Sequence, residues 1–331
     1  MRKAVVLTSG GLDSLLTIGM LRNAGIEVAG VHFYGWFNTP PYTEIDGLPD
    51  EDMQLGIRVL NSDITEEYIP HLLNPVHGYG SGVNPCIDCK LLFLKKAGSY
   101  MRSIGADFVA TGEVLGQRPM SQRSGIMRML SKRSGLGGYL LRPLSARLLM
   151  PTIPEELGWV DRNNLLDISG RGRSRQIALA ATLGIEDYPS PAGGCLLTEK
   201  SFQKRFSDLV SSGKTVEARD FIILKYGRHF RLSGSCKLVV GRNQAENEYL
   251  MKLSWGTARI DAVRPKGPFS LMDWDGNEAH LRTALGIIAR YMKPGSGDDG
   301  ISFIVQMGDS ERIVTYKDMP DSTTAERLMI R

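Results

Sequence analysis

Residues 4–14 have the sequence Ala-Val-Val-Leu-Thr-Ser-Gly-Gly-Leu-Asp-Ser, which joins a short apolar run to a pair of glycines. The apolar run predicts a buried strand over residues 4–8, and the apolar spacing beyond Ser14 predicts a helix. Gly10 and Gly11 let the backbone wrap closely around an anion, at which a helix start directs its unpaired N–H groups. The hydroxyls of Ser9 and Ser14 add two donors. The stretch therefore predicts a phosphate-binding loop between a strand and a helix.

The rest of the first third of the chain repeats this alternation of strand and helix. Short apolar runs predict strands at 27–33, 56–60 and 107–111, and the stretches between them are long enough for helical crossovers. This pattern is typical of a doubly wound parallel α/β sheet. The run from Gly35 to Asp52, rich in proline, glycine and acids, is interpreted as a surface loop or lid.

The alternation of strand and helix signals ends after about residue 150, which predicts that the chain continues into other structural units. We expect an ATP-binding domain over residues 1–150, a helical segment with a cysteine over 151–200, and a smaller α/β domain over 201–331. In the last of these, strands are predicted at 228–232, 237–240, 257–263, 301–307 and 311–316. A helix is predicted at 244–253, and another carries Leu281, Leu285, Ile288 and Met292 on one face.

Composition limits the class of protein without identifying it. The 331 residues are 42% hydrophobic, which is enough for two cores, and no apolar run approaches the length of a membrane span. The apolar run at the start of the chain is too short to form the core of a signal peptide, so we expect a cytoplasmic protein. The net charge of +4 permits a nucleic-acid partner but does not by itself predict one.

The hexapeptide from Ser9 to Ser14 resembles the PP-loop of the ATP pyrophosphatases and differs from a Walker loop, because no Gly-Lys-Ser/Thr follows. That resemblance implies ATP cleaved between its α and β phosphates. The Asp13 carboxylate is suited to holding Mg²⁺ against the nucleotide and is expected to be catalytic. The residues expected to bind the nucleotide are Ser9, Gly10, Gly11, Asp13, Ser14, His32, Gly112 and Gln117.

Three of the four cysteines form a second expected site. Cys86 and Cys89 lie three positions apart before a helical run, and Cys195 follows two glycines far along the chain. Three thiolates without an obvious fourth ligand favour a 4Fe-4S cluster with one open iron. The alternatives are a metal-free Cys89–Cys195 pair with persulfide chemistry, a zinc site that recruits Cys236, and inert cysteines. Cys236 is otherwise expected to be a small buried residue.

Two segments resemble tRNA thiouridine synthetases. The sequence Asn-Pro-Cys-Ile-Asp-Cys at 84–89 and the Gly-Gly-Cys-Leu-Leu-Thr-Glu-Lys-Ser-Phe run at 193–202 are similar to the 2-thiouridine synthetases. The run at 110–117, followed by Ser121-Gln122, is similar to the 4-thiouridine synthetases. The resemblance implies that Cys89 and Cys195 are the catalytic pair and that tRNA is the substrate. Neither an N-terminal RNA-binding extension nor a rhodanese-like tail is evident, so sulfur is expected from another protein or from free sulfide.

Two basic runs are expected to contact RNA phosphates, although a solvated basic face is the simpler alternative. Their members are Arg118, Arg123, Arg128, Lys132 and Arg133 in a loop after the 111–113 turn, and Arg171, Arg173 and Arg175 near a helix start. The run from Lys237 to Glu248 faintly resembles an RNA-associated module of ribosome quality-control factors.

These observations predict an ATP-dependent tRNA thiouridine synthetase that adenylates a uridine oxygen and replaces it with sulfur. ATP, Mg²⁺ and a 4Fe-4S cluster are the expected cofactors, and a homodimer is left open. The alternatives are a PP-loop enzyme that adenylates a small molecule and a non-catalytic iron-sulfur or RNA-binding protein.

Overall fold

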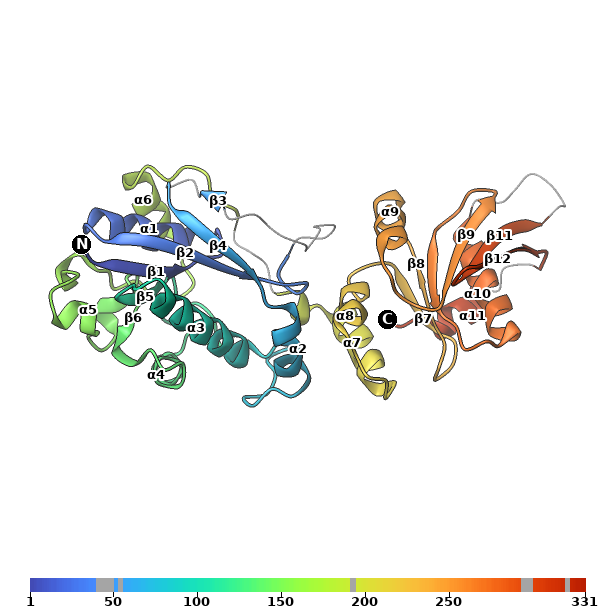
Figure 1. Cartoon of the computed structure of the whole chain (residues 1–331), viewed down its shortest axis with the longest axis horizontal. Coiled ribbons are helices and arrows are strands. Elements are labelled where there is room, and N and C mark those ends of the chain that lie inside the picture. Colours follow the sequence, from blue (N-terminus) through green and yellow to red (C-terminus); the bar gives the residue numbers. More distant parts are fainter. Residues whose placement is uncertain (40–50, 53–55, 191–194, 293–299, 319–321) are drawn as a thin grey trace. The chain divides into compact units, whose positions relative to one another are not determined.

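A computed structural model describes residues 1–39, 51–52, 56–190, 195–292, 300–318 and 322–331 (Figure 1). The chain divides between residues 195 and 196 into two compact units. The segment from 151 to Cys195 has its contacts within the first unit. Within the described residues, no helix combines the length and the apolar character that a membrane span requires.

The first unit is built on a six-stranded sheet with the order β3-β4-β2-β1-β5-β6. Five strands are parallel, and β3 at the edge runs antiparallel to β4. The strands are β1 (Lys3–Leu7), β2 (Glu27–Tyr34), β3 (Glu51–Asp52), β4 (Arg58–Asp63), β5 (Phe108–Thr111) and β6 (Leu140–Leu141). The predicted parallel α/β sheet is confirmed, with β3 and β6 as strands that the sequence pattern did not predict.

Helices cover both faces of this sheet, with α1 and α6 on one side and α3 and α4 on the other (Figure 1). Leu12, Leu15 and Leu16 of α1 pack against Ala180 of α6 in one buried cluster. The helices are α1 (Leu12–Asn23), α2 (Thr65–Leu73), α3 (Cys86–Ser103), α4 (Ser124–Arg133), α5 (Ile153–Glu156) and α6 (Ser174–Thr182), with short 3-10 turns at Gly137–Tyr139, Ala146–Leu148 and Arg162–Asn164.

The central strand β1 fixes where a ligand can bind. It pairs with β2 on one side and β5 on the other, and the chain winds in opposite directions from these two strands. At such a reversal, the loops at the carboxyl ends of the two central strands separate and leave a crevice. The loop at 8–11 and the turn at 112–113 both follow these ends, so they face the same crevice.

The second unit has an antiparallel sheet of order β12-β11-β9-β10-β8-β7. Its strands are β7 (Arg228–Arg231), β8 (Lys237–Val240), β9 (Ala258–Arg264), β10 (Ser270–Asp273), β11 (Ile301–Met307) and β12 (Ser310–Tyr316). The core lies between this sheet and α10, where Leu238, Ile260 and Phe303 meet Leu285 and Ile288. The helices are α7 (Lys200–Ser211), α8 (Ala218–Ile223), α9 (Gln244–Lys252), α10 (Glu278–Arg290) and α11 (Ser322–Leu328), and a 3-10 turn spans Leu196–Thr198.

Two expectations about local structure are wrong, and a third is only partly tested. The basic run at 118–133 is not a loop throughout, because α4 begins at Ser124. Among the described residues of the segment at 151–197, helical structure is confined to α5, α6 and short turns. Most of the predicted lid at 35–52 lies outside the described residues, but its first residues pack into the unit, with Trp36 fully buried.

Candidate functional site

The phosphate loop after β1 is closed by its own hydrogen bonds. Gly10 has a φ of 69°, a conformation that glycine adopts without strain. The Gly10 N–H donates to Thr8 Oγ1 at 3.2 Å, and the Ser14 hydroxyl donates to the Gly11 carbonyl at 2.7 Å. The Ser14 hydroxyl proton thus stabilises the loop itself, although the sequence predicted that Ser14 donates to the nucleotide. Gly11 caps α1 without a side chain, so the first N–H groups of the helix are left for an anion.

Asp13, in the first turn of α1, meets a residue 104 positions away. Gln117 Nε2 donates to Asp13 Oδ2 at 3.0 Å. The other oxygen, Asp13 Oδ1, is buried and has no hydrogen-bond partner within the described part of the chain. A buried carboxylate oxygen without a partner is costly, and Mg²⁺ prefers such an oxygen ligand. The donor set at the loop therefore fits a magnesium nucleotide.

Gly112 brings the end of β5 against the start of α1. A Cβ atom built on Gly112 would lie 2.5 Å from the backbone carbon of Asp13 and 2.7 Å from the Ser14 nitrogen. Real Cβ contacts are never this short, so only glycine permits the approach. This contact places the 112–117 segment over the phosphate loop.

The next residue, Glu113, forms a buried ion network that the sequence analysis gave no role. Arg142 Nε donates to Glu113 Oε2 at 2.9 Å, and Lys90 Nζ lies 3.5 Å from Oε1. Burial alone would raise the pKa of the Glu113 carboxyl, but Lys90 and Arg142 lower it to about 2. The remaining Arg142 donors bind Ser131 Oγ and the Met127 carbonyl, both in α4. Glu113 thus connects the turn that packs on the phosphate loop with Lys90, the residue that follows Cys89.

The cysteines at the start of α3 lie beside Cys195. Cys86 accepts a hydrogen bond from Asn84 Nδ2 at 3.0 Å, and all three cysteines are free and partly buried as residues. Burial raises the pKa of the Cys89 thiol to about 12, Lys90 opposes this, and the neighbouring Cys195 and Cys86 add to it. The structure therefore brings together the three cysteines that the sequence grouped, two of them more than 100 positions from the third.

The spacing of these sulfurs bears on the metal that they fit. In the described part of the chain, the three do not form a group in which all sulfurs lie within 4.8 Å of one another, as ligands of one ion would. In an iron-sulfur cluster each cysteine binds a different iron, so the ligands are spaced more widely. To bind one zinc ion together, the three sulfurs would have to move closer to one another.

Tyr68 of α2 is a second residue that the sequence analysis missed. Its ring is 1% exposed and stacks on Phe37 with ring centroids 3.9 Å apart. Its hydroxyl hydrogen-bonds with the Cys89 thiol, and burial together with the three nearby thiols raises the pKa of Tyr68 well above 10. The phenol therefore stays protonated and presents a donor to the cysteines. A lone tyrosine on a helix carries no sequence motif that signals this role.

One loop, at 112–122, contacts both halves of the site. Gln117 binds Asp13, while Met120 Sδ lies 3.9 Å from Asn84 Nδ2, the group that donates to Cys86. Gly80 is packed against the same Asn84 and Met120 side chains. The phosphate loop and the cysteines are therefore neighbours in one continuous site.

His32, expected to bind the nucleotide, lies in β2 and pairs with a neighbouring strand. Its Nδ1 is 3.0 Å from Asn61 Oδ1, and burial lowers its pKa despite this hydrogen bond. A neutral imidazole at this position is compatible with contact to a base, which stays a prediction.

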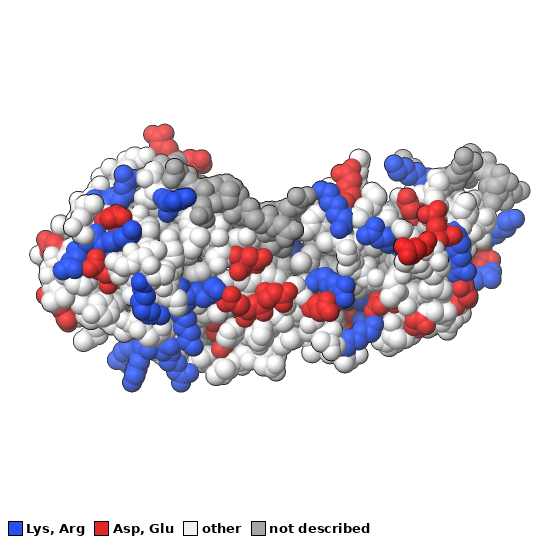
Figure 2. Space-filling view, in the orientation of Figure 1, with Lys and Arg blue, Asp and Glu red and all other residues white. Residues whose placement is uncertain are grey.

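The basic residues of the first run lie on the exposed surface of α4 and the segment before it. Figure 2 shows Lys and Arg side chains gathered where Figure 1 places α4. Arg133 Nη1 lies 2.9 Å from His77 Nε2. Arg118, Arg123, Arg128 and Lys132 are exposed and make no ion pair or side-chain hydrogen bond with other described residues.

The second basic run lies beside the loop that carries Gln117. The Gly170 N–H donates to the Leu115 carbonyl at 2.7 Å, which places residues 170–173 next to that loop. Arg175 pairs with Asp167 at 2.6 Å, so its charge is compensated within the fold. Arg171 and Arg173 have no such partner among the described residues. The two are therefore better placed than Arg175 to bind a ligand anion.

Comparison with known families matches each unit to a different model. Residues 2–149 match the tRNA methyl transferase HUP domain, and residues 227–329 match the NFACT protein RNA binding domain. Their boundaries fall within the first and second compact units, respectively.

Curated relatives match over about two thirds of this chain. The tRNA-specific 2-thiouridylase MnmA of Streptococcus uberis is 28% identical over 239 residues, which cover 66% of this chain and 60% of the relative. The same enzyme of Streptococcus pyogenes is 27% identical over 237 residues, with coverage of 65% and 59%. The chain thus spans about 60% of the length of these relatives.

A solved structure described as a predicted subunit of tRNA methyltransferase from Methanocaldococcus jannaschii aligns with 43% of this chain and 68% of its own, at 17% identity. Its TM-score of 0.23 is too low to support an argument. The phosphate loop, the parallel sheet and the HUP match agree with one another. The first part of this chain is therefore similar to the tRNA methyl transferase HUP domain, and about two thirds of the chain is similar to the tRNA-specific 2-thiouridylases.

Proposed function

We propose that this protein is an ATP-dependent tRNA thiouridine synthetase. The observation that carries the proposal is the loop at 112–122, which binds Asp13 through Gln117 and packs on the Cys86 segment through Met120. Adenylation at a phosphate loop acts on the oxygen of a carbonyl group and sulfur then attacks the carbon of the same group, so the two steps must share one site. The 2-thiouridylase relatives support tRNA as the substrate.

The first half of the reaction belongs to the phosphate loop. ATP would lie against residues 9–14 with its phosphates at the start of α1, where the N–H groups and the helix dipole favour negative charge. A uridine carbonyl oxygen attacks the α-phosphorus, and the bond between the α and β phosphates breaks to release pyrophosphate. Asp13 Oδ1 would hold Mg²⁺, which neutralises charge on the phosphates. Gln117 keeps the other oxygen of Asp13 fixed during this step.

The second half belongs to the cysteines. Hydrosulfide adds to the adenylated carbon, and AMP leaves with the former carbonyl oxygen, so that a carbon–sulfur double bond replaces the carbon–oxygen bond. A 4Fe-4S cluster held by Cys86, Cys89 and Cys195 would supply an open iron that carries the sulfide. Tyr68 donates a hydrogen bond on the cysteine side, and Lys90 adds positive charge that attracts the anionic sulfur. The sulfide comes from a donor protein or from solution.

The RNA would contact both units. The second unit matches an RNA-binding model, and α4 of the first unit displays unpaired cations at the surface. Arg171 and Arg173, beside the Gln117 loop, are suited to the phosphates of ATP or of the tRNA backbone.

Two variants separate the two halves of the reaction. Asp13→Ala is expected to abolish release of AMP and pyrophosphate from ATP in the presence of tRNA. Cys195→Ala is expected to release pyrophosphate at close to the parent rate while forming no thiouridine. Full thiolation by either variant would refute the role assigned to it. AMP release that does not respond to tRNA would favour a small-molecule substrate instead.

A further inference from the structure

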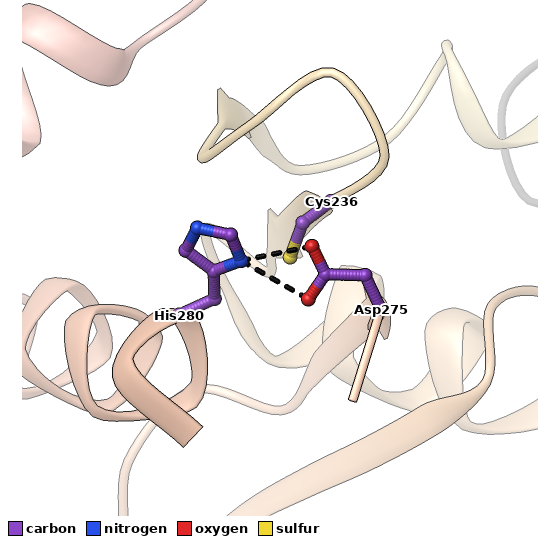
Figure 3. Close-up of side chains that lie close together, drawn as sticks. All are labelled: Cys236, Asp275 and His280. Atoms are coloured by element: carbon purple, nitrogen blue, oxygen red, sulfur yellow. Dashed lines mark hydrogen bonds and ion pairs between the residues drawn. The ribbon is translucent and has the colours of Figure 1, made fainter. Parts of the chain in front are cut away.

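Three side chains of metal-binding type meet at one end of the sheet in the second unit (Figure 3). Cys236 directly precedes β8, Asp275 lies in the loop between β10 and α10, and His280 belongs to the first turn of α10. One donor atom from each residue lies within 4.8 Å of the other two. None of these residues belongs to the site in the first unit.

Neighbouring groups orient the carboxylate of Asp275. Its Oδ2 accepts from the Ser235 hydroxyl at 2.9 Å and from the Ser233 hydroxyl at 3.2 Å. His280 Nδ1 lies 2.9 Å from the same oxygen and 3.0 Å from Oδ1. A ligand whose position is fixed by such contacts needs little rearrangement to bind a metal ion.

The spacing suits one tetrahedral ion. Zinc holds sulfur at about 2.3 Å and nitrogen or oxygen at about 2.0–2.2 Å, which separates the ligand atoms by roughly 3.3–3.6 Å. In the present group every pair of donor atoms lies within 4.8 Å, and His280 Nδ1 lies 2.9 Å from Asp275 Oδ2, so small shifts of these side chains would reach that spacing. To bind an ion, the His280–Asp275 hydrogen bond must be exchanged for two metal bonds. The ion can enter from solvent, because the side chains of His280 and Asp275 are 24% and 17% exposed.

The chemistry of the ligands selects the ion. Cys236 is fully buried within the apolar core of the unit, so its sulfur would bind the ion from the core side, and Asp275 and His280 would bind it from the surface side. Sulfur with imidazole and carboxylate favours zinc over Mg²⁺ or Ca²⁺, which prefer oxygen ligands. With three protein ligands, the fourth position would hold water. The alternative is that Asp275 only caps the loop before α10 and that Cys236 only fills the core.

We propose that Cys236, Asp275 and His280 form a zinc site that clamps the turn before β8 to the start of α10. On binding, the Cys236 thiol releases its proton and the thiolate becomes a ligand. The site would stabilise the unit that matches the RNA-binding model, independently of the reaction in the first unit.

The test uses cobalt in the full chain with the other thiols removed. In the Cys86→Ser/Cys89→Ser/Cys195→Ser variant, Cys236 is the only remaining cysteine, so any thiolate-to-cobalt charge-transfer band must come from it. We expect this band on anaerobic addition of Co²⁺, with saturation at one ion per chain and loss of the band when Zn²⁺ is added. Adding Cys236→Ser should abolish the band.

The surface ligands provide the second measurement, since they can be replaced without disturbing the core. Adding Asp275→Asn or His280→Gln to the triple variant should weaken cobalt binding at least about tenfold. Adding Ser310→Ala, an exposed change on β12, is the matched control and should leave binding unchanged. Absence of the charge-transfer band, or a band that does not respond to loss of both Asp275 and His280, would overturn the proposal.

Discussion

Gln117 donates a hydrogen bond to Asp13 across 104 positions of sequence, at 3.0 Å. The contact fixes one carboxylate oxygen and leaves the other, which is buried, for a ligand. Gln117 belongs to the loop that also packs on the segment before Cys86. The orientation of Asp13 is therefore linked to the position of the cysteines.

Removing this donor should slow adenylation without unfolding the protein. A hydrogen bond to a charged group contributes about 1.5–3 kcal/mol, so Gln117→Ala should lower the rate of tRNA-dependent pyrophosphate release by roughly ten- to a hundredfold. Gln244→Ala is the control, since Gln244 is exposed in α9 and bonds only Glu248 among the contacts described. Equal rates for both variants and the parent would show that the contact has no role in the reaction.

Gly112→Ala should be far more damaging than its size suggests. The added methyl would lie 2.5 Å from the Asp13 backbone, so the phosphate loop must move. Displacement of a catalytic group by about 1 Å can cost about a hundredfold in rate, and we expect at least this loss of pyrophosphate release. Gly125→Ala is the control because its added Cβ meets nothing within 4 Å. A Gly112→Ala enzyme with parent activity would mean that the loop tolerates a shift.

The buried Glu113 carboxylate should make the first unit more stable at neutral pH than at acidic pH. Its folded pKa of about 2 is below the ordinary 4.5, so its stabilising effect is present above pH 4.5 and is lost as the pH falls towards 2. Glu113→Gln leaves Lys90 and Arg142 without their partner and should lower the free energy of unfolding by about 3 kcal/mol at neutral pH.

Urea unfolding of parent and Glu113→Gln, followed by fluorescence in a Trp255→Phe/Trp274→Phe background, reports on the first unit alone. The difference between them should stay nearly constant from about pH 7 to about pH 5 and shrink as the pH is lowered from about 4.5 towards about 2. A difference that stays constant or grows below about pH 4.5 would show that Glu113 is not ionised in the network.

Tyr68→Phe should affect sulfur transfer and leave adenylation intact. The change removes only the hydroxyl that hydrogen-bonds with Cys89, and the ring still stacks on Phe37. We expect pyrophosphate release at the parent rate with thiouridine formation slowed about tenfold. Tyr100→Phe, in α3, is the control. Equal slowing of both steps would show that the Tyr68 hydroxyl supports the structure of the whole site and has no specific role in sulfur transfer.

The exposed cations of α4 and of its N-cap residue Arg123 should contribute to the salt dependence of tRNA binding. Each phosphate contact adds about 0.7–0.9 to the slope of log affinity against log salt, so Arg123→Ala/Arg128→Ala/Lys132→Ala should reduce that slope by about 2–3. Lys96→Ala is the control, because Lys96 already pairs with Glu67 at 2.6 Å. An unchanged slope in the triple variant would remove this helix from the RNA interface.

The fold of the first unit could be predicted because its signals are local. Apolar runs of strand length, separated by helical periods, determine β1, β2 and β5, and the glycine pair marks where β1 ends. Strand β6 was missed because it is two residues long, and α4 was interpreted as a loop because its basic residues hid the few apolar positions, Met127 and Leu130, that it buries.

The site was only partly accessible to sequence reasoning. Motifs grouped the three cysteines and the phosphate loop, but the contacts that join them are between residues far apart in sequence. Neither Tyr68 nor Arg142 belongs to a pattern, and Glu113 was quoted without a role because its partners, Lys90 and Arg142, come from other elements. Cys236 was expected to be a buried residue, and its neighbours Asp275 and His280 became visible only in the folded chain.

The most direct test of the proposed function is mass spectrometry of nucleosides from unmodified tRNA incubated anaerobically with the protein, ATP, Mg²⁺ and sulfide. We expect a thiouridine that requires ATP, and none with the Asp13→Ala or Cys195→Ala variant. Release of AMP and pyrophosphate by the parent protein without any thionucleoside would contradict the proposed function.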